Sequence, residues 1–163
     1  MRILRHLFSG PWQVRRRFCK DAMQRIQTEI TSSEHQHLGE LRFAVEAGLH
    51  WRALLHGTTA RARAIEVFSQ LRIWDTEHNS GVLIYLLLAD RDVEIVADRG
   101  IHAKVGEQVW RDICLSMEMH FRQGRFEQGI IEGIQAITAQ LQLHFPADTD
   151  RNPNELPNIP VVL

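Results

Sequence analysis

The sequence has little cysteine, no surplus of positive charge and no long hydrophobic run. Its two cysteines belong to no Cys-x-x-Cys pair, which indicates a reducing compartment. The 19 basic residues are balanced by 20 acidic ones, whereas a dedicated nucleic-acid-binding domain normally carries a basic surplus. The longest apolar run, Val82 to Ala89, is far shorter than a membrane span, and the N-terminus lacks the apolar core of a signal peptide. We therefore expect a soluble, cytoplasmic protein that binds no nucleic acid and has no transmembrane segment.

The charge is nevertheless uneven, because basic residues gather at the N-terminus. Six lie within the first twenty positions: Arg2, Arg5, Arg15, Arg16, Arg17 and Lys20. One interpretation is the solvated start of a helix, and the other is a surface that contacts an acidic partner or a membrane. The second interpretation would place the protein at the periphery of the inner membrane surface.

Hydrophobic periodicity predicts four helices and three strands. The expected helices cover residues 12–37, 60–73, 109–123 and 126–144, and the expected strands cover 41–47, 82–89 and 92–98. Strand 82–89 is apolar on both faces, so it should be the central, fully covered strand. Residues 98–106 should form a loop.

The order of these elements predicts the topology and the domain organisation. A strand–helix–strand unit makes the first two strands parallel, and a tight turn at Asp90-Arg91 makes the third antiparallel. We therefore expect an α/β fold with a small mixed sheet sandwiched between helices (α/β/α). The expected divisions are a basic segment at 1–19, the domain at 20–145 and a tail at 146–163. That tail holds four of the five prolines, so it should be extended and contribute little to the core.

Residues 20–145 resemble the TPM-domain family, also called the TPM phosphatase family. The resemblance lies in RARAIEVFSQLRIWDTEHNSGVLIYLLLADRDVEIVADRGI and in the later FRQGRFEQGIIEGI. Its most specific parts are the strand entry Asn79-Ser80-Gly81-Val82-Leu83 and the strand exit Asp98-Arg99-Gly100-Ile101. The resemblance implies an α/β/α sandwich, divalent-cation binding in some members and acid phosphatase activity in a few. Without a signal peptide or membrane anchor, the chain is similar to a short soluble branch of the family.

Several polar residues should meet at one edge of the predicted sheet, where two strands start and the third ends. A cation site there would use the oxygen atoms of Glu40, Asp75, Asn79 and Asp98, with Glu34 and His37 as additional ligands. Hard oxygen ligands favour Ca²⁺ or Mg²⁺ over Mn²⁺ or Zn²⁺, which the histidines would favour. Arg99 would bind the ligand and stabilise its negative charge.

The alternative for this edge is a structural polar cluster without a cation. In that interpretation Asp75 caps a turn, Asp98 fixes its loop and Arg99 pairs with Glu40. A di-iron centre is excluded because Glu34-x-x-His37 has no second copy in the chain.

Two other phosphatase-like patterns have simpler explanations. The Cys19-x₅-Arg25 spacing lies on the apolar stripe of the first expected helix and lacks the glycines of a phosphate loop, so we interpret Cys19 as a helical residue. The Asp90-Arg91-Asp92 sequence is better explained as a hairpin turn than as an aspartate nucleophile. Sequence motifs of P-loops, dinucleotide sites and serine hydrolases are absent.

Two functional hypotheses follow. The first is a cation-binding TPM-like module, which in its catalytic form would be a weak, metal-assisted phosphate-ester hydrolase. The second is a non-catalytic adaptor whose basic N-terminus and proline-rich tail dock a membrane-associated protein partner. The sequence does not specify the substrate, the partner or the oligomeric state.

Overall fold

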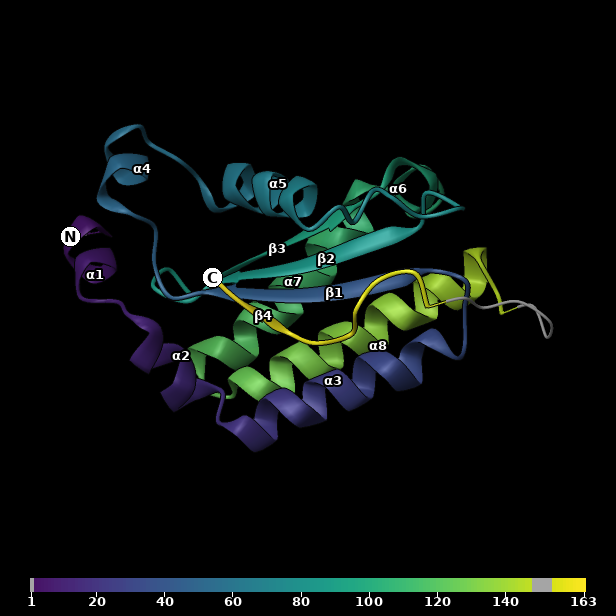
Figure 1. The fold of residues 1–163 in the computed structure, drawn as a ribbon, viewed down its shortest axis with the longest axis horizontal. Helices are drawn as coiled ribbons and strands as arrows, with labels where there is room; N and C mark the ends of the chain where they lie inside the picture. The colour runs from purple at the N-terminus through teal and green to yellow at the C-terminus, as the bar shows by residue number, and fades with distance from the viewer. Residues whose placement is uncertain (1, 148–153) are drawn as a thin grey trace.

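The computed structural model describes residues 2–147 and 154–163, and its elements are shown in Figure 1. The helices are α1 (Arg2–Leu7), α2 (Pro11–Arg17), α3 (Lys20–Glu34), α4 (Trp51–Leu55), α5 (Ala60–Gln70), α6 (Arg99–Val105), α7 (Glu107–Arg122) and α8 (Phe126–His144). The strands are β1 (Glu40–Glu46), β2 (Gly81–Leu87), β3 (Asp92–Ala97) and β4 (Val161–Val162).

The sheet has the order β3-β2-β1-β4 and mixes parallel with antiparallel pairs. Strands β1 and β2 are parallel, with Glu40 opposite Gly81, while β2 and β3 are antiparallel, with Ile84 opposite Ile95. Both relationships confirm the prediction from element order. The turn at Asp90-Arg91 is also confirmed, and Arg91 there has a positive φ of 54°.

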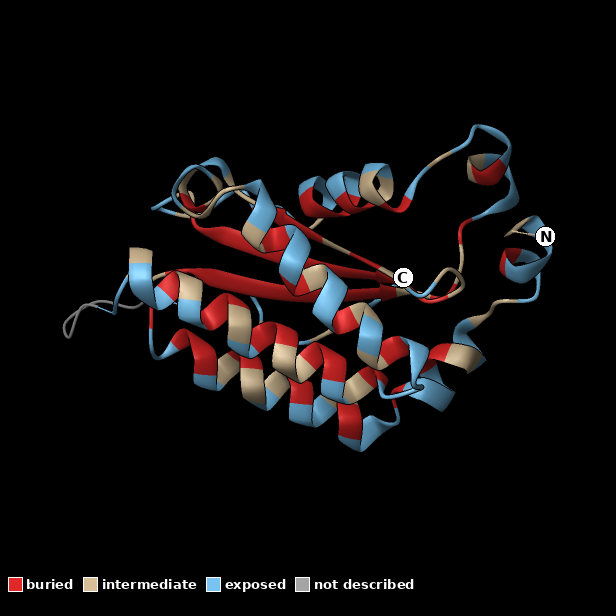
Figure 2. Ribbon diagram, turned by 180° about the vertical axis from the view of Figure 1, so that it is seen from behind, coloured by how far each residue is buried: buried red, intermediate tan, exposed pale blue. Residues whose placement is uncertain are grey.

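Helices cover both faces of the sheet, which confirms the predicted α/β/α architecture (Figures 1 and 2). The larger core lies between one face and helices α2, α3, α7 and α8, and the smaller core lies under α4 and α5. Strand β2 alternates between them, since Ile84 enters the larger core and Tyr85 the smaller one. Every residue of β2 is buried, as its continuous apolar sequence predicts.

The helix expected over 12–37 is two helices, α2 and α3, so that prediction was wrong in its continuity. The chain leaves helical geometry at Phe18 (φ −122°, ψ 86°), and Cys19 is the N-cap residue of α3 instead of a helical residue. Val14 and Phe18 reach the same core as Ile26 on α3. Because α2 and α3 pack against the same core, the apolar residues keep a helical spacing through the bend. The sequence pattern therefore does not show that the helix is interrupted.

The loop expected over 98–106 also needs correction, because residues 99–105 form helix α6. Its N-cap is Asp98, whose Oδ1 accepts a hydrogen bond of 2.7 Å from the N–H of Arg99. Ile101 on this helix is fully buried in the larger core. Capping and burial together stabilise a short helix in a segment whose composition is typical of a turn.

The C-terminal tail contributes to the fold, contrary to the expectation that it would add little to the core. Strand β4 pairs in parallel with β1, placing Val161 opposite Ala44, and the N–H of Leu163 donates to the carbonyl of Val45. Leu156 and Val161 pack against the smaller core. An exposed edge of β1 would leave main-chain groups unpaired, and the tail covers that edge with a short segment rich in proline.

None of the helices in the described part of the chain is long and apolar enough to cross a membrane.

Candidate functional site

The polar residues predicted to meet do lie at one edge of the sheet. Glu40 starts β1 opposite Gly81 at the start of β2, and Val82 lies opposite Ala97 at the end of β3. Whether these side chains can share one ligand depends on the groups that each of them contacts.

Glu40 uses its carboxylate to hold the C-terminal tail. Its two oxygens accept hydrogen bonds of 3.0 and 3.1 Å from the N–H groups of Glu155 and Leu156. The side chain is almost fully buried, and burial raises its pKa, although the two N–H donors oppose that shift. Glu40 therefore acts as an anchor for the chain that covers it.

Glu34 and Arg42 complete a buried polar cluster with Glu40. Glu34 accepts a hydrogen bond of 3.1 Å from the N–H of Leu41, and burial together with the charge of Glu40 raises its pKa to about 8. Burial lowers the pKa of Arg42, and its Nη1 donates to the carbonyl of Pro157. The tail therefore supplies both donors and an acceptor to this cluster.

His37 is fully buried and both of its ring nitrogens are in use. Its Nδ1 accepts a hydrogen bond from the N–H of Gly39 at 3.2 Å, so Nε2 carries the proton toward Oγ of Ser33 at 2.8 Å. Ser33 in turn lies 2.6 Å from Oγ1 of Thr138 on α8. Burial lowers the pKa of His37 to about 4, which keeps the ring neutral as a link between α3 and α8.

The remaining predicted ligands belong to the loop before β2 and to the start of α6. Asp75 pairs with Arg72 at 3.1 Å, and Oδ1 of Asn79 accepts a hydrogen bond of 3.3 Å from Nε of Arg99. Asp98 caps α6, as described above. Arg99 therefore contacts Asn79, whereas the sequence suggested a pairing with Glu40.

The two glycines of the TPM-like motifs explain why this loop and α6 lie so close. A Cβ added at Gly100 would be 2.6 Å from the carbonyl oxygen of Asn79, and one at Gly81 would collide with the carbonyl of Ile73. Asn79 itself has a positive φ of 49°, which asparagine tolerates better than most residues. The motif residues thus build a tight structural joint between the β2 entry and α6.

The predicted ligands consequently share an edge without forming one ligand set. Within residues 2–147 and 154–163, no group of three or more His, Cys, Asp or Glu side chains lies close enough to hold a metal ion. Glu34 and Glu40 lie under the tail, whereas His37 bonds to Ser33 and Gly39. Asp75, Asn79 and Asp98 bond to neighbouring groups outside the tail. A cation at this edge stays a prediction.

A second region is formed by α1, α2 and the turn between β2 and β3. Asp90 in this turn binds α1 through three basic side chains: Arg2 at 2.8 Å, Arg5 at 3.4 Å and His6 at 3.1 Å. His6 is buried, and its Nδ1 accepts a hydrogen bond of 2.9 Å from the N–H of Leu49. The aspartate that resembled a phosphatase nucleophile is therefore the anchor of the N-terminal helix.

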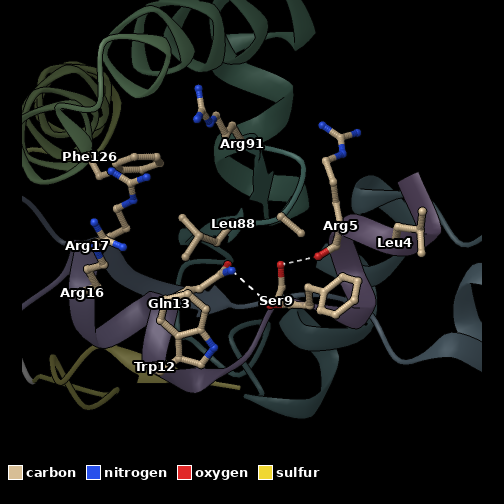
Figure 3. Close-up of a pocket in the computed structure, with 12 residues that line it drawn as sticks. Leu4, Arg5, Ser9, Trp12, Gln13, Arg16, Arg17, Leu88, Arg91 and Phe126 are labelled. Atoms are coloured by element: carbon tan, nitrogen blue, oxygen red, sulfur yellow. Dashed lines mark hydrogen bonds between the residues drawn. The ribbon is translucent and has the colours of Figure 1, made fainter. Parts of the chain in front are cut away.

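Between these helices and the turn lies a groove of about 520 Å³, which we call the arginine groove (Figure 3). It is lined by Leu4, Arg5, Phe8, Ser9, Trp12, Gln13, Arg16, Arg17, Leu88, Ala89, Arg91 and Phe126. Its four arginines are exposed, and none of its lining residues is acidic. The guanidinium of Arg17 lies over the ring of Phe126, 5.1 Å from the ring centroid. This groove suits a ligand that is both negatively charged and partly apolar.

Sequence reasoning found the basic N-terminus but missed the groove. The spacing of Arg16 and Arg17 was visible, whereas Arg91 and Leu88 come from a turn more than seventy residues away. The exposed apolar residues Leu4, Phe8 and Trp12, interleaved with the arginines, were the available signal.

The layers of the fold, and the close contact between the loop before β2 and α6, define an α/β/α domain with a mixed four-stranded sheet. The chain belongs to the TPM domain family, whose model matches residues 18–140. No curated protein matches the chain.

The solved structures that resemble the chain include the following two. The BA42 protein of the psychrophilic bacterium Bizionia argentinensis is 29% identical, with a TM-score of 0.78 over 88% of this chain and 93% of that one. The N-terminal domain of a protein from P. gingivalis is 19% identical and shares the fold, with a TM-score of 0.62 over 80% of this chain and 83% of that one.

Proposed function

We propose that this TPM domain is an interaction module that binds an anionic partner through the arginine groove. The observation that carries the proposal is the grouping of Arg16, Arg17 and Arg91 around an apolar floor, without a carboxylate among the lining residues. Arg5 adds positive charge beside them, although it also pairs with Asp90. Arginine is suited to this task because its planar guanidinium binds carboxylates and phosphates in a bidentate manner.

The groups that a catalytic mechanism would need have other contacts, which supports binding over hydrolysis. Arg25 of the Cys-x₅-Arg spacing lies on α3 and pairs with Glu127, so residues 20–25 do not curl around a phosphate. Asp90 is held by Arg2, Arg5 and His6, and Asp98 caps α6.

The proposal is tested with inositol hexakisphosphate, a soluble polyanion, by titration calorimetry on the full chain. We expect binding at low salt that weakens as salt screens the arginines. Arg16→Glu combined with Arg17→Glu should abolish it. The matched control reverses Arg72 and Arg111, which are exposed, lie outside the groove and pair with Asp75 and Glu107. Equal affinities for the two double variants would contradict the proposal.

A divalent cation at Asp98 is a second candidate, supported by one observation. Oδ2 of Asp98 is buried and has no hydrogen-bond partner within the described part of the chain. An unused buried carboxylate oxygen is costly unless a counter-charge approaches it. This candidate keeps the cation hypothesis open, and Asn79 of the neighbouring motif, which accepts a hydrogen bond from Arg99, is a second oxygen donor for it.

A further inference from the structure

Helices α1 and α2 have one face that packs on the domain and another that faces solvent. His6 on α1 and Val14 on α2 are almost completely buried. On the opposite side, Leu4, Phe8 and Trp12 are 57%, 74% and 57% exposed. The inward face fixes the two helices in place, so the outward apolar side chains are held on a rigid support.

The outward face combines these apolar side chains with positive charge. Leu4 and Trp12 flank the arginine groove in Figure 3, and Arg16, Arg17 and Arg91 surround its floor at Leu88. Exposed Ile3 and Leu7 extend the apolar area along α1. A cluster of exposed apolar residues of this kind marks an interaction surface, since soluble domains otherwise keep such patches small.

The shape of this surface discriminates between a membrane and an acidic protein. An acidic amphipathic helix would need an apolar groove in which to place its own apolar side chains. Here Phe8 lines the groove but stays 74% exposed, and Leu4 and Trp12 are each 57% exposed, so these side chains stand out toward solvent and no deep apolar cavity encloses them. Protruding Leu, Phe and Trp side chains beside Arg are typical of helices that lie in the interface of an anionic bilayer.

We propose that α1 and α2 dock the domain on an anionic phospholipid membrane. This inference rests on the proposed function and names the partner of the same groove. Leu4, Phe8 and Trp12 enter the boundary between headgroups and acyl chains, while Arg16, Arg17 and Arg91 bind lipid phosphates. The negative surface potential of such a membrane attracts the arginines, and apolar burial retains the protein.

The test is co-sedimentation of the full chain with phosphatidylcholine vesicles, with and without phosphatidylglycerol. Binding should require the anionic lipid and should fall as salt rises. Arg16→Glu with Arg17→Glu should weaken partitioning by about thirty-fold or more, since each arginine near an anionic surface contributes roughly a fivefold preference. The control reversal of Arg72 and Arg111 should leave it unchanged.

A second pair of variants tests insertion separately from charge. Phe8→Ser with Trp12→Ser keeps every charge but should strongly reduce vesicle binding. Leu115→Ser with Met119→Ser removes two similarly exposed apolar residues from α7 and should have no effect. Melting curves of all variants verify that each is folded.

The outcomes separate the membrane from the broader proposal. Arginine-dependent binding of inositol hexakisphosphate without vesicle binding would overturn the membrane inference and leave the proposed function in place. The same holds if an acidic peptide binds but vesicles do not. Equal binding to neutral and anionic vesicles, or no effect of Phe8→Ser with Trp12→Ser, would also overturn it. Failure of every anionic probe to bind would overturn both.

Discussion

His6 and Asp90 lie 3.1 Å apart, and their contact holds α1 against the turn between β2 and β3. Nδ1 of His6 accepts a hydrogen bond from the N–H of Leu49, which leaves Nε2 facing the carboxylate of Asp90. Burial would raise the pKa of Asp90, but Arg2 and His6 outweigh it and hold that pKa below its ordinary value. Asp90 therefore attaches the N-terminal helix to this turn through three basic side chains.

Asp90→Asn should loosen α1 and destabilise the protein by about 1–2 kcal/mol, because it removes a partly buried, charge-assisted set of hydrogen bonds. A carboxylate with a lowered pKa stabilises the fold above its unfolded pKa, and this contribution is lost as pH falls through the folded pKa. The difference between wild type and variant should therefore shrink in acid. Denaturant melts at several pH values measure it, with exposed Asp112→Asn as control. A difference independent of pH would contradict the assignment.

Glu34→Gln should stabilise the protein at alkaline pH, whereas Asp90→Asn should destabilise it. The pKa of Glu34 rises from 4.5 to about 8 on folding, so between these values the folded state holds a proton that the unfolded state releases. The contribution of Glu34 to the free energy of unfolding is fully present below pH 4.5 and is lost as the pH rises toward 8. The glutamine variant should match wild type in acid and exceed it by about 1–3 kcal/mol at pH 8. Exposed Glu66→Gln is the control, and a variant less stable at pH 8 would refute the prediction.

The two residues of β4 provide a matched pair for the role of the tail. Val161 packs on the smaller core, whereas Val162 is 51% exposed. Val161→Ser should lower the melting temperature by a few degrees, corresponding to about 1–2 kcal/mol, and Val162→Ser should change it little. Removal of residues 148–163 should cost more, because Glu40 then loses two N–H donors inside the protein. An unaffected melting temperature after that truncation would show that the tail is dispensable.

The cation hypothesis makes a prediction of its own. A cation that binds only the folded state at a hundredfold excess over Kd adds about 2.7 kcal/mol. If Asp98 contributes to such a site, millimolar Ca²⁺ should raise the melting temperature, and Asp98→Ala should remove that increment besides weakening the α6 cap. Asp112→Ala should retain it. Identical melting curves with Ca²⁺, Mg²⁺, Mn²⁺ and chelator would eliminate the site.

We expect weak or absent turnover of a generic aryl phosphate. Any activity that belongs to the protein should survive Cys19→Ser and Asp90→Asn, because Cys19 lies at the N-cap position of α3, before residues 20–25 that are helical, and Asp90 anchors α1. Loss of an oriented catalytic group typically reduces rates by about 10²–10⁴-fold, which an assay resolves easily. A loss of that size with Asp90→Asn alone would revive the aspartate-nucleophile interpretation.

The sequence by itself determined the elements whose residues carry a regular apolar pattern. Strand β2 is apolar on both faces and proved to be the covered central strand, and the order of elements was enough for the parallel and antiparallel pairs. It also placed Glu40, Asn79 and Asp98 at one edge of the sheet, because strand direction decides which ends meet.

Only the tertiary structure decided what those side chains and the two chain ends do. Whether Glu40 faces an ion or the N–H groups of the tail depends on a segment 115 residues away along the chain, and no local pattern encodes that contact. The bend at Phe18 is hidden because both flanking helices fill one core. The arginine groove likewise depends on tertiary structure. The ion pairs of Asp90 hold α1 beside the turn between β2 and β3, and this brings arginines from distant parts of the chain together.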